Sequence, residues 1–338
     1  MAVWVTEPVS AFFWHSLRRL DEAVYVAGGR LEGGRPPAGE RPWALVVRNR
    51  TRVEEALLEA LTPPLRLVAR LGSGLDNVDL EAARRLGVEV VSAPALNAEA
   101  TADFTWLLAL AASRHLERAL GRSRAGPAER LAMAGRQLAG RTWGVVGFGA
   151  VGRRVAARAL AWGMRVLALP PRHPVPAPPG VAWSGLEELL GRSDVVSLHL
   201  PLTAETYHLL DAGRLALLRP GSLLVNTARG ALVDEEALLA ALERGRPAAA
   251  ALDVREEPLR EPDPLAGHPR VLLTPHVAGW SREALAAVER RVLGELARRL
   301  PGGGAGPAGP RSRRSRLTPR APAGRGRGSA PDGGGARP

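Results

Sequence analysis

Three residues in the C-terminal half of the chain have the types and the order that reduction of an organic acid would need. Arg229, in the segment 226–230 (NTARG), can bind a carboxylate through two parallel hydrogen bonds, because its planar guanidinium keeps its charge. Histidine has an unperturbed pKa near neutrality, so His276 can give a proton to a developing alkoxide. Glu257 precedes a proline and would favour the protonated imidazole if it lay beside it. Together they indicate reduction of a 2-oxo acid by a hydride carrier.

A glycine turn upstream of these residues is typical of dinucleotide binding. Gly147, Gly149 and Gly152 follow an apolar run at 143–146 and open a helical pattern. The first glycine permits a tight turn, the second lets the backbone approach a pyrophosphate, and the third allows close packing of the helix on the sheet. The cofactor-binding residues predicted on this basis are Gly147, Phe148, Gly149, Ala150, Val151 and Gly152.

The acid that usually accepts the ribose hydroxyls of NAD is absent from its ordinary place. There is no acidic residue from Arg153 through Leu186, and the second strand of this unit ends near Arg172. Because Arg172 could pair with a 2′-phosphate, we predict a preference for NADP(H) over NAD(H). In the alternative interpretation Arg172 is solvated and water holds the ribose.

Each candidate residue also has a structural interpretation. A histidine at a strand end is often part of the framework, an arginine before a glycine can simply solvate a turn, and Glu256 and Glu257 can be a surface pair. The chain has no G-x-S-x-G elbow and no His/Asp/Glu cluster with metal-ligand spacing, so we predict neither a serine hydrolase nor a metal site. The histidines that we assign to structural or surface positions are His15, His115, His173, His208 and His268.

The composition is that of a globular enzyme. The chain has 338 residues, 46% of them hydrophobic, which is enough for two domains with buried cores. It has no cysteine, which excludes disulfides and thiolate zinc sites. No apolar run approaches the roughly 20 residues of a membrane helix, and the N-terminus lacks the pattern of a secretory signal. We therefore expect a cytoplasmic protein that does not bind membranes.

Most of the net charge of +12 lies at the C-terminus. Residues 301–338 hold eight arginines and one acid, a net +7, which leaves +5 for the first 300 residues. This segment is rich in Gly, Pro and Ala, and we predict that it is a disordered tail. Arg/Gly segments can contact RNA, but no aromatic side chains are interleaved here, so we do not expect a nucleic-acid partner.

The elements that must position the site alternate between strand-like and helical patterns, which predicts an α/β fold with two parallel sheets. After a strand-like N-terminus, the first series has strands at 23–26, 44–47, 65–69 and 88–91, with helical patterns at 53–61 and 80–86. A helix at 98–118 and a connector at 121–140 lead to strands at 143–146, 165–169, 194–200, 222–227, 249–254 and 271–274. With the glycine turn after its first strand, the second series is a doubly wound dinucleotide fold. A last helix should run from Ser281, its N-cap, to about Leu300.

Several segments resemble the D-isomer-specific 2-hydroxyacid dehydrogenase family. Besides the glycine turn, they are 68–79 (VARLGSGLDNVD), 197–203 (SLHLPLT), 226–234 (NTARGALVD) and 274–276 (TPH). The similarity covers about residues 45–295, and the segment 98–104 is most similar to the glyoxylate/hydroxypyruvate reductase branch. The resemblance implies an NAD(P)-dependent oxidoreductase acting on a D-2-hydroxy acid or its 2-oxo acid, typically as a homodimer joined through the cofactor domains.

The resemblance also implies residue roles and a domain order. Arg229, Glu257 and His276 would be catalytic, Ser73 and Gly74 would offer backbone N–H groups to the substrate carboxylate, and Arg70 lies beside that loop. Further cofactor-side positions are Thr101, His199, Pro201, Thr206, Thr227, Ala228, Asp253 and Gly279. A Rossmann cofactor domain (98–281) would be inserted into a flavodoxin-like substrate domain (1–97 and 282–300), followed by the tail (301–338).

Three features depart from the family pattern. The stretch from Asp253 to Glu257 is one residue shorter than usual, and Arg255 stands where an aromatic is common. This leaves open whether Glu257 or Glu256 reaches His276. The acid after the second cofactor-domain strand is absent, and the last helix runs directly into the tail.

The favoured function is reduction of a small 2-oxo acid such as glyoxylate or hydroxypyruvate. One alternative is an enzyme similar to phosphoglycerate dehydrogenase, acting on 3-phosphohydroxypyruvate. Another is a non-catalytic, nucleotide-sensing interaction protein on the same fold, and a third is RNA binding through residues 311–327. The sequence does not indicate the physiological direction of the reaction.

Overall fold

The computed structural model describes residues 2–25, 41–120, 122, 124–172, 176–259 and 261–300. His173 and the predicted disordered tail at 301–338 lie outside the described residues. Within them the fold is α/β, with two sheets whose strands all run parallel, as predicted.

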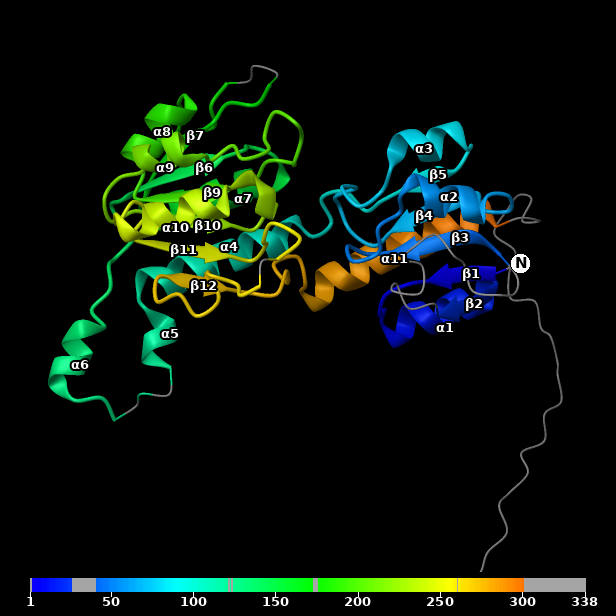
Figure 1. The fold of residues 1–338 in the computed structure, drawn as a ribbon, viewed down its shortest axis with the longest axis horizontal. Coiled ribbons are helices and arrows are strands. Elements are labelled where there is room, and N and C mark those ends of the chain that lie inside the picture. The colour runs from blue at the N-terminus through cyan, green and yellow to red at the C-terminus, as the bar shows by residue number, and fades with distance from the viewer. Residues whose placement is uncertain are drawn as a thin grey trace, which may run out of the picture. The chain divides into compact units, whose positions relative to one another are not determined.

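The first sheet has five strands in the order β2-β1-β3-β4-β5 (Figure 1). Its strands are β1 (Ala2–Val5), β2 (Glu22–Tyr25), β3 (Pro42–Val47), β4 (Leu67–Arg70) and β5 (Glu89–Val91). Every residue of β1 and β3 is buried, because helices cover both faces of a parallel sheet. The strand order is that of flavodoxin-like folds, which confirms the predicted class.

The second sheet has seven strands in the order β12-β11-β10-β9-β6-β7-β8. They are β6 (Thr142–Val146), β7 (Arg165–Ala168), β8 (Val181–Trp183), β9 (Val195–Leu198), β10 (Leu223–Asn226), β11 (Ala249–Leu252) and β12 (Val271–Leu273). The direction of winding reverses between β6 and β9. In open α/β sheets, ligands bind beyond the carboxyl ends of the strands at such a reversal.

Helices connect the strands and cover the sheets. In the first part of the chain they are α1 (Ala11–Leu20), α2 (Glu55–Leu61), α3 (Leu80–Arg85), α4 (Ala98–Ser113), α5 (Leu116–Ala119) and α6 (Pro127–Ala132). Later ones are α7 (Ala150–Ala161), α8 (Leu186–Arg192), α9 (Ala212–Leu217), the 3-10 turn η2 (Gly230–Leu232), α10 (Glu235–Glu243) and α11 (Arg282–Arg299). None of the described helices combines the length and the apolarity that a membrane span requires.

The structure corrects three expected elements. The second sheet has a further strand, β8, which its three-residue length hid among prolines and glycines. The predicted connector at 121–140 contains α6, which begins at a proline in its first turn. The helix expected at 98–118 is divided into α4 and α5, because His115 adopts a left-handed φ of 51° between them.

The last helix, α11, packs on the first sheet. Its residues Val288, Val292 and Leu296 belong to one buried core with Phe13 of α1 and the strands of that sheet. The Ser281 side chain accepts a hydrogen bond from the N–H of Ala284, which confirms the predicted N-cap. The C-terminal end of the described chain therefore returns to the N-terminal sheet.

Candidate active site

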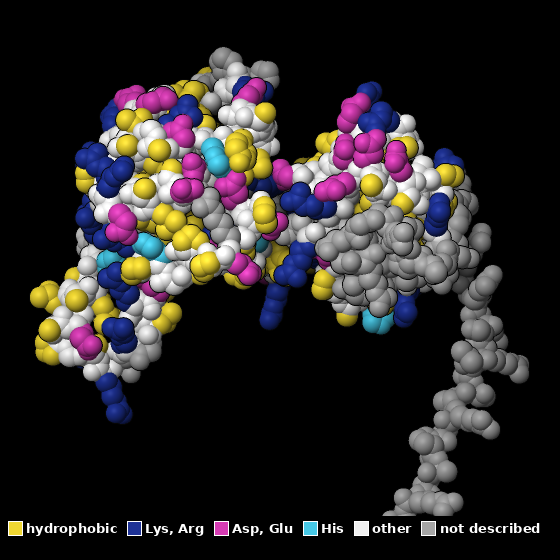
Figure 2. Space-filling model, in the orientation of Figure 1, with side chains coloured by type: hydrophobic (Ala, Val, Ile, Leu, Met, Phe, Trp, Pro, Cys, Tyr) yellow, Lys and Arg dark blue, Asp and Glu magenta, His cyan; other side chains and the backbone are white. Residues whose placement is uncertain are grey.

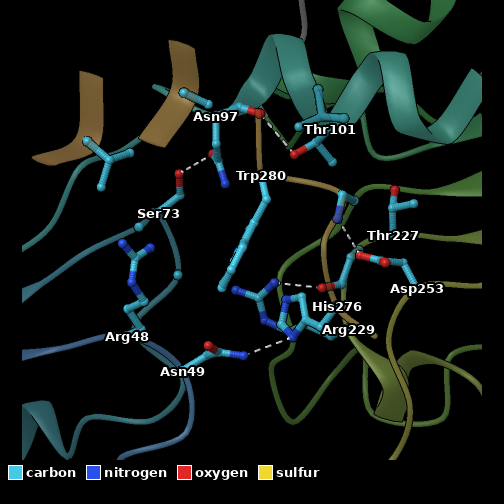
Figure 3. A pocket seen from close by; sticks show the side chains of 18 of the residues that line it. Arg48, Asn49, Ser73, Asn97, Thr101, Thr227, Arg229, Asp253, His276 and Trp280 are labelled. Atoms are coloured by element: carbon cyan, nitrogen blue, oxygen red, sulfur yellow. Dashed lines mark hydrogen bonds between the residues drawn. The ribbon is translucent and has the colours of Figure 1, made fainter. Parts of the chain in front are cut away.

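One pocket collects most of the residues that the sequence singled out (Figure 3). The predicted residues that line it are Arg70, Ser73, Gly74, Thr101, Val151, His199, Pro201, Thr227, Ala228, Arg229, Asp253, His276 and Gly279. The predicted residues outside its lining are Gly147, Phe148, Gly149, Ala150, Gly152, Arg172, Thr206 and Glu257.

Arg229 follows β10 and reaches the pocket through a local turn. The Asn226 side chain forms that turn, because its amide donates to the Arg229 carbonyl oxygen at 2.7 Å and its Oδ1 accepts from the Ala228 N–H at 3.0 Å. Gly230 lets another segment approach closely, since a Cβ there would lie 1.9 Å from the backbone carbonyl carbon of Arg255. Arg229 is thus held by its own sequence neighbours at the carboxyl edge of the sheet.

Asp76 holds one edge of the Arg229 guanidinium. Both Nε and Nη2 of Arg229 donate to Oδ2 of Asp76 at 2.6 Å, and Nη1 donates to the Ala228 carbonyl oxygen at 2.6 Å. A guanidinium has five N–H groups, so two remain on its terminal edge, the arrangement that binds a carboxylate bidentately. Sequence reasoning missed Asp76, although it lies only two residues after Gly74.

His276 lies in a loop that Asp253 shapes. The buried Asp253 carboxylate accepts hydrogen bonds from the Thr274 hydroxyl at 2.6 Å and from the N–H groups of Val277 and Ala278 at 2.9 and 2.8 Å. The His276 N–H donates to the Asp253 carbonyl oxygen at 2.9 Å. These bonds hold His276 at a φ of 58°, a left-handed conformation that non-glycine residues rarely adopt.

The surroundings of His276 favour its neutral form. Desolvation of the ring in the pocket lowers its pKa, although His276 as a residue is exposed. Asp253 raises that pKa, the positive charges of Arg229 and Arg70 lower it, and Glu257 has the smallest of these effects. The predicted influence of Glu257 therefore has the expected sign, but burial and the two guanidinium groups outweigh it.

The described hydrogen bonds and ion pairs include none between Glu256 and His276. The Glu256 carboxylate accepts hydrogen bonds from the Tyr207 hydroxyl at 3.0 Å and from Nε2 of His208 at 2.9 Å. Glu257 is exposed, and the described hydrogen bonds include none between Glu257 and His276. The ring of His276 instead contacts Asn49, a residue that sequence reasoning missed, with 3.2 Å between Asn49 Nδ2 and His276 Nδ1 (Figure 3).

The glycine turn before α7 has the geometry expected of its three glycines. Gly147 has a φ of 103°, and a Cβ there would lie 2.8 Å from the carbonyl carbon of His199. A Cβ on Gly152 would lie 2.0 Å from the Gly147 carbonyl oxygen. A Cβ on Gly149 would meet nothing within 4 Å, so the space before the helix N-terminus is open. The turn fits a pyrophosphate bound by backbone N–H groups.

The other predicted cofactor-binding side chains make different contacts. The His199 ring stays neutral, because burial lowers its pKa to about 3, and its Nε2 lies 2.9 Å from the Ser197 hydroxyl. The Thr227 hydroxyl lies 2.8 Å from that of Thr105. Thr206 donates to the Pro201 carbonyl oxygen at 2.8 Å, so it stabilises the turn that places Pro201 in the lining.

Ser73 connects the substrate-side loop to the start of α4. Its hydroxyl donates to Oδ1 of Asn97 at 2.6 Å, and Asn97 also lines the pocket. Thr101, one turn further along α4, donates its hydroxyl proton to the Asn97 carbonyl oxygen at 2.9 Å. Sequence reasoning missed Asn97, whose place before the predicted helix made it resemble an ordinary cap.

Two further arginines line the pocket. The Arg48 side chain is buried, lies 3.4 Å from the Glu289 carboxylate and donates from Nε to the Pro8 carbonyl oxygen at 3.1 Å. Burial lowers the pKa of Arg70 to about 10, and its Nε has no described hydrogen-bond partner. The sequence pointed to Arg70 but not to Arg48.

Arg172 stands outside this pocket. Its guanidinium pairs with the Glu205 carboxylate, and both side chains are largely exposed. The ion pair is compatible with either interpretation of Arg172, because an exposed pair contributes little and can exchange for another anion.

The sequence matches that of a known family. The model of the D-isomer specific 2-hydroxyacid dehydrogenase NAD binding domain covers residues 106–278. The glyoxylate reductase of Aeropyrum pernix is 44% identical over 231 residues, 65% of this chain and 69% of that protein. The (S)-sulfolactate dehydrogenase of Chromohalobacter salexigens is 43% identical over 248 residues, 71% of this chain and 79% of that protein.

The fold agrees with a solved structure. The TT0316 protein of Thermus thermophilus superposes with a TM-score of 0.76 at 37% sequence identity. The match covers 87% of this chain and 94% of that chain.

Proposed function

Because the chain belongs to the D-isomer specific 2-hydroxyacid dehydrogenase family, whose members are NAD(P)-dependent enzymes, we propose that it reduces a small 2-oxo acid such as glyoxylate or hydroxypyruvate. The observation that carries this proposal is the meeting of Arg229 and His276 in one pocket with the Ser73–Gly74 loop. A carboxylate clamp and a proton donor are what such a substrate requires of the protein.

We infer the protein's part in the reaction from these positions. The free terminal edge of Arg229 binds the substrate carboxylate and polarises the neighbouring carbonyl, and the N–H groups of Ser73 and Gly74 bind the carboxylate from the other side. His276 donates a proton to the oxygen on C2 of the substrate. Glu257 influences the charge of His276 through space. In the oxidation direction His276 takes the proton back.

A nicotinamide cofactor fits the glycine turn, and when bound it supplies the hydride. The open space at Gly149 accommodates its pyrophosphate at the α7 N-terminus, and Thr101, Val151 and Thr227 line the pocket. No acidic residue follows β7 at the usual position, and Arg172 lies shortly after that strand. We therefore favour NADP(H) over NAD(H) as the cofactor.

A direct test is reduction of a panel of 2-oxo acids by the purified full-length chain with NADH or NADPH, followed at the nicotinamide absorbance band. His276→Ala should lower kcat by at least about a hundredfold, since general acid catalysis contributes on that order, and leave cofactor affinity unchanged. A variant that retains kcat would refute the role of His276. Failure of the whole panel would favour a nucleotide-sensing interaction protein.

A second candidate substrate class carries another anionic group, such as the phosphate of 3-phosphohydroxypyruvate or a sulfonate. The observation that favours it is the presence of Arg48 and Arg70 in the same pocket as Arg229. The name of the Chromohalobacter relative is in line with it. If this candidate is correct, Arg70→Ala should raise KM for the doubly anionic acid and leave KM for glyoxylate nearly unchanged.

The assembly and domain division are further parts of the proposal. Residues 1–97 and 282–300 form the substrate domain and 98–281 the cofactor domain, through which two chains form a homodimer. The support for a contact surface is apolar exposure at the end of α5 and on α6, where Leu120 and Leu131 are 69% and 78% exposed (Figure 2). Comparing the sedimentation of Leu131→Glu with that of the unchanged chain tests this surface.

An RNA partner would instead be supported by RNA affinity that depends on salt and is lost when residues 301–338 are deleted.

A further inference from the structure

The contact between Asn49 and His276 joins two loops that are remote in sequence. Asn49 follows β3 of the first sheet, and His276 follows β12 of the second. The Asn49 amide nitrogen lies 3.2 Å from Nδ1 of the ring, and the described hydrogen bonds give the ring no other partner (Figure 3). Both residues line the pocket.

The side chains of Glu7 and Asn77 hold the backbone on both sides of Asn49. The Glu7 carboxylate, which is 6% exposed as a residue, accepts from the N–H groups of Arg48 and Thr51 at 2.9 and 3.1 Å. The Asn77 amide donates to the carbonyl oxygens of the same two residues at 2.9 and 2.7 Å. The segment that presents Asn49 is therefore fixed independently of the pocket.

A side-chain amide suits a histidine that must both give and take a proton. When the amide nitrogen donates to Nδ1, the neutral ring carries its proton on Nε2. When the ring is protonated, the amide turns by half a rotation and its oxygen accepts from Nδ1–H. Asn49 thus keeps the ring oriented in either protonation state, whereas a carboxylate in its place would favour the imidazolium.

The charged groups that face His276 come from several elements. Arg70 is the last residue of β4, Arg229 lies in the loop after β10, and Asp253 and Glu257 lie in the segment after β11. Two of these groups are positive and two are negative. Because Asn49 is uncharged, it can orient the His276 ring without adding a charge to either side. Exposed Glu257 has no described hydrogen bond with which to orient the ring.

We propose that Asn49 is the positioning residue of His276: its amide binds Nδ1 and directs Nε2 toward the substrate oxygen. The inference rests on the proposed role of His276 as proton donor. It assigns to the first sheet a part in the acid–base machinery besides its part in substrate binding.

The primary test is the ring nitrogen spectrum of the full-length chain labelled with ¹⁵N-histidine, with His276→Ala identifying the signals. The unchanged protein should show the neutral His276 with its proton on Nε2. Asn49→Ala should give a mixture of tautomers. Asn49→Asp should raise the pKa of His276 by about one unit and move the proton toward Nδ1. Arg52→Ala, an exposed residue of the same loop outside the pocket lining, is the control.

Kinetics provide a second readout. Asn49→Ala should lower kcat about tenfold to a hundredfold, as expected for loss of a residue that orients a reacting group, with KM for NAD(P)H unchanged. Asn49→Asp should move the alkaline limb of the pH–rate profile for reduction to higher pH. The proposal is overturned if the His276 spectrum is the same in all Asn49 variants, or if Glu257→Gln changes it more than they do. Absence of turnover in the unchanged protein would sink the proposed function while the spectra still decide the contact.

Discussion

At the scale of single residues, the proposed carboxylate-binding group, Arg229, is distinct from Asp76, which orients it. Asp76 occupies one edge of the Arg229 guanidinium and leaves the terminal edge for the proposed carboxylate ligand. A negative charge so close to an anion site also has a cost, since it repels the substrate carboxylate. The two effects predict opposite results on removal of Asp76, so that residue can be tested sharply.

We expect Asp76→Ala to lower kcat/KM for the 2-oxo acid by roughly tenfold, because a guanidinium free to rotate no longer meets the carboxylate in the reactive geometry. Steady-state kinetics at saturating cofactor measure this. Glu81→Ala, which removes an exposed acid of α3 whose partner is Arg84, is the control. A fall in KM with unchanged kcat would mean that repulsion outweighs orientation.

Cofactor choice is also a question about single residues. If Arg172 binds the 2′-phosphate, Arg172→Ala should raise KM for NADPH about tenfold, which corresponds to roughly 1.4 kcal/mol, and leave KM for NADH unchanged. Glu205→Gln should lower KM for NADPH, since it frees Arg172 from its present ion pair. Arg192→Ala, at an exposed pair with Glu188 of the same helix, is the control. Equal KM values for both cofactors in the unchanged protein would contradict the preference.

At the scale of elements, an ionic network anchors the short segment after β11. Arg255 donates to Glu235 of α10 from Nε at 2.8 Å and to Asp263 from Nη1 at 2.8 Å. These bonds raise the pKa of Arg255 and lower that of Asp263. The network fixes the backbone that passes behind Gly230 and leads to Glu257.

Gly230→Ala should disrupt this junction, because the new methyl group would lie 1.9 Å from the Arg255 carbonyl carbon and neither backbone can give way cheaply. We expect a loss of about 2 kcal/mol or more in the free energy of unfolding, and a fall in kcat as Arg229 moves. Urea unfolding and kinetics measure the two effects.

The matched control is Gly191→Ala, inside α8, where the nearest atom would lie 3.8 Å from the new Cβ. This change should stabilise the protein by about 0.5–1 kcal/mol, since alanine loses less backbone entropy in a helix. Equal behaviour of the two variants would show that the junction tolerates a side chain.

At the scale of the whole molecule, the neutral His199 makes stability depend on pH. Its pKa is about 3 in the folded chain, against the usual histidine value of 6.5. As the pH falls from 6.5 toward 3, the unfolded chain takes up a proton that the folded chain refuses, so stability declines in this window. The decline should reach up to about 1.4 kcal/mol for each pH unit.

Urea unfolding at several pH values, compared between the unchanged chain and His199→Gln, measures this contribution. The variant should have a flatter dependence between about pH 6.5 and pH 4, because glutamine does not titrate. Identical slopes would mean that other groups account for the acid sensitivity.

The amino-acid sequence alone was enough for the parts of this protein that are encoded locally. Apolar periodicity predicted two parallel α/β sheets, and the roles of Gly147, Gly149 and Gly152 follow from a turn of six residues. Arg229 and His276 were also readable, because strands that run parallel bring their carboxyl ends to one edge. Short or interrupted elements such as β8 and α6 escaped, since three to six residues carry too little periodicity.

Which side chains support the catalytic candidates depended on the packing of the whole chain. Asp76 reaches Arg229 across 153 positions, and Asn49 reaches His276 across 227. Such pairings depend on how two separately formed sheets pack, and no local pattern encodes that. The same holds for Glu256, whose carboxylate is hydrogen-bonded to His208 rather than to His276. Local hydrogen bonding and hydrophobic period determine elements within a few residues, whereas partners between elements are determined by packing of the whole chain.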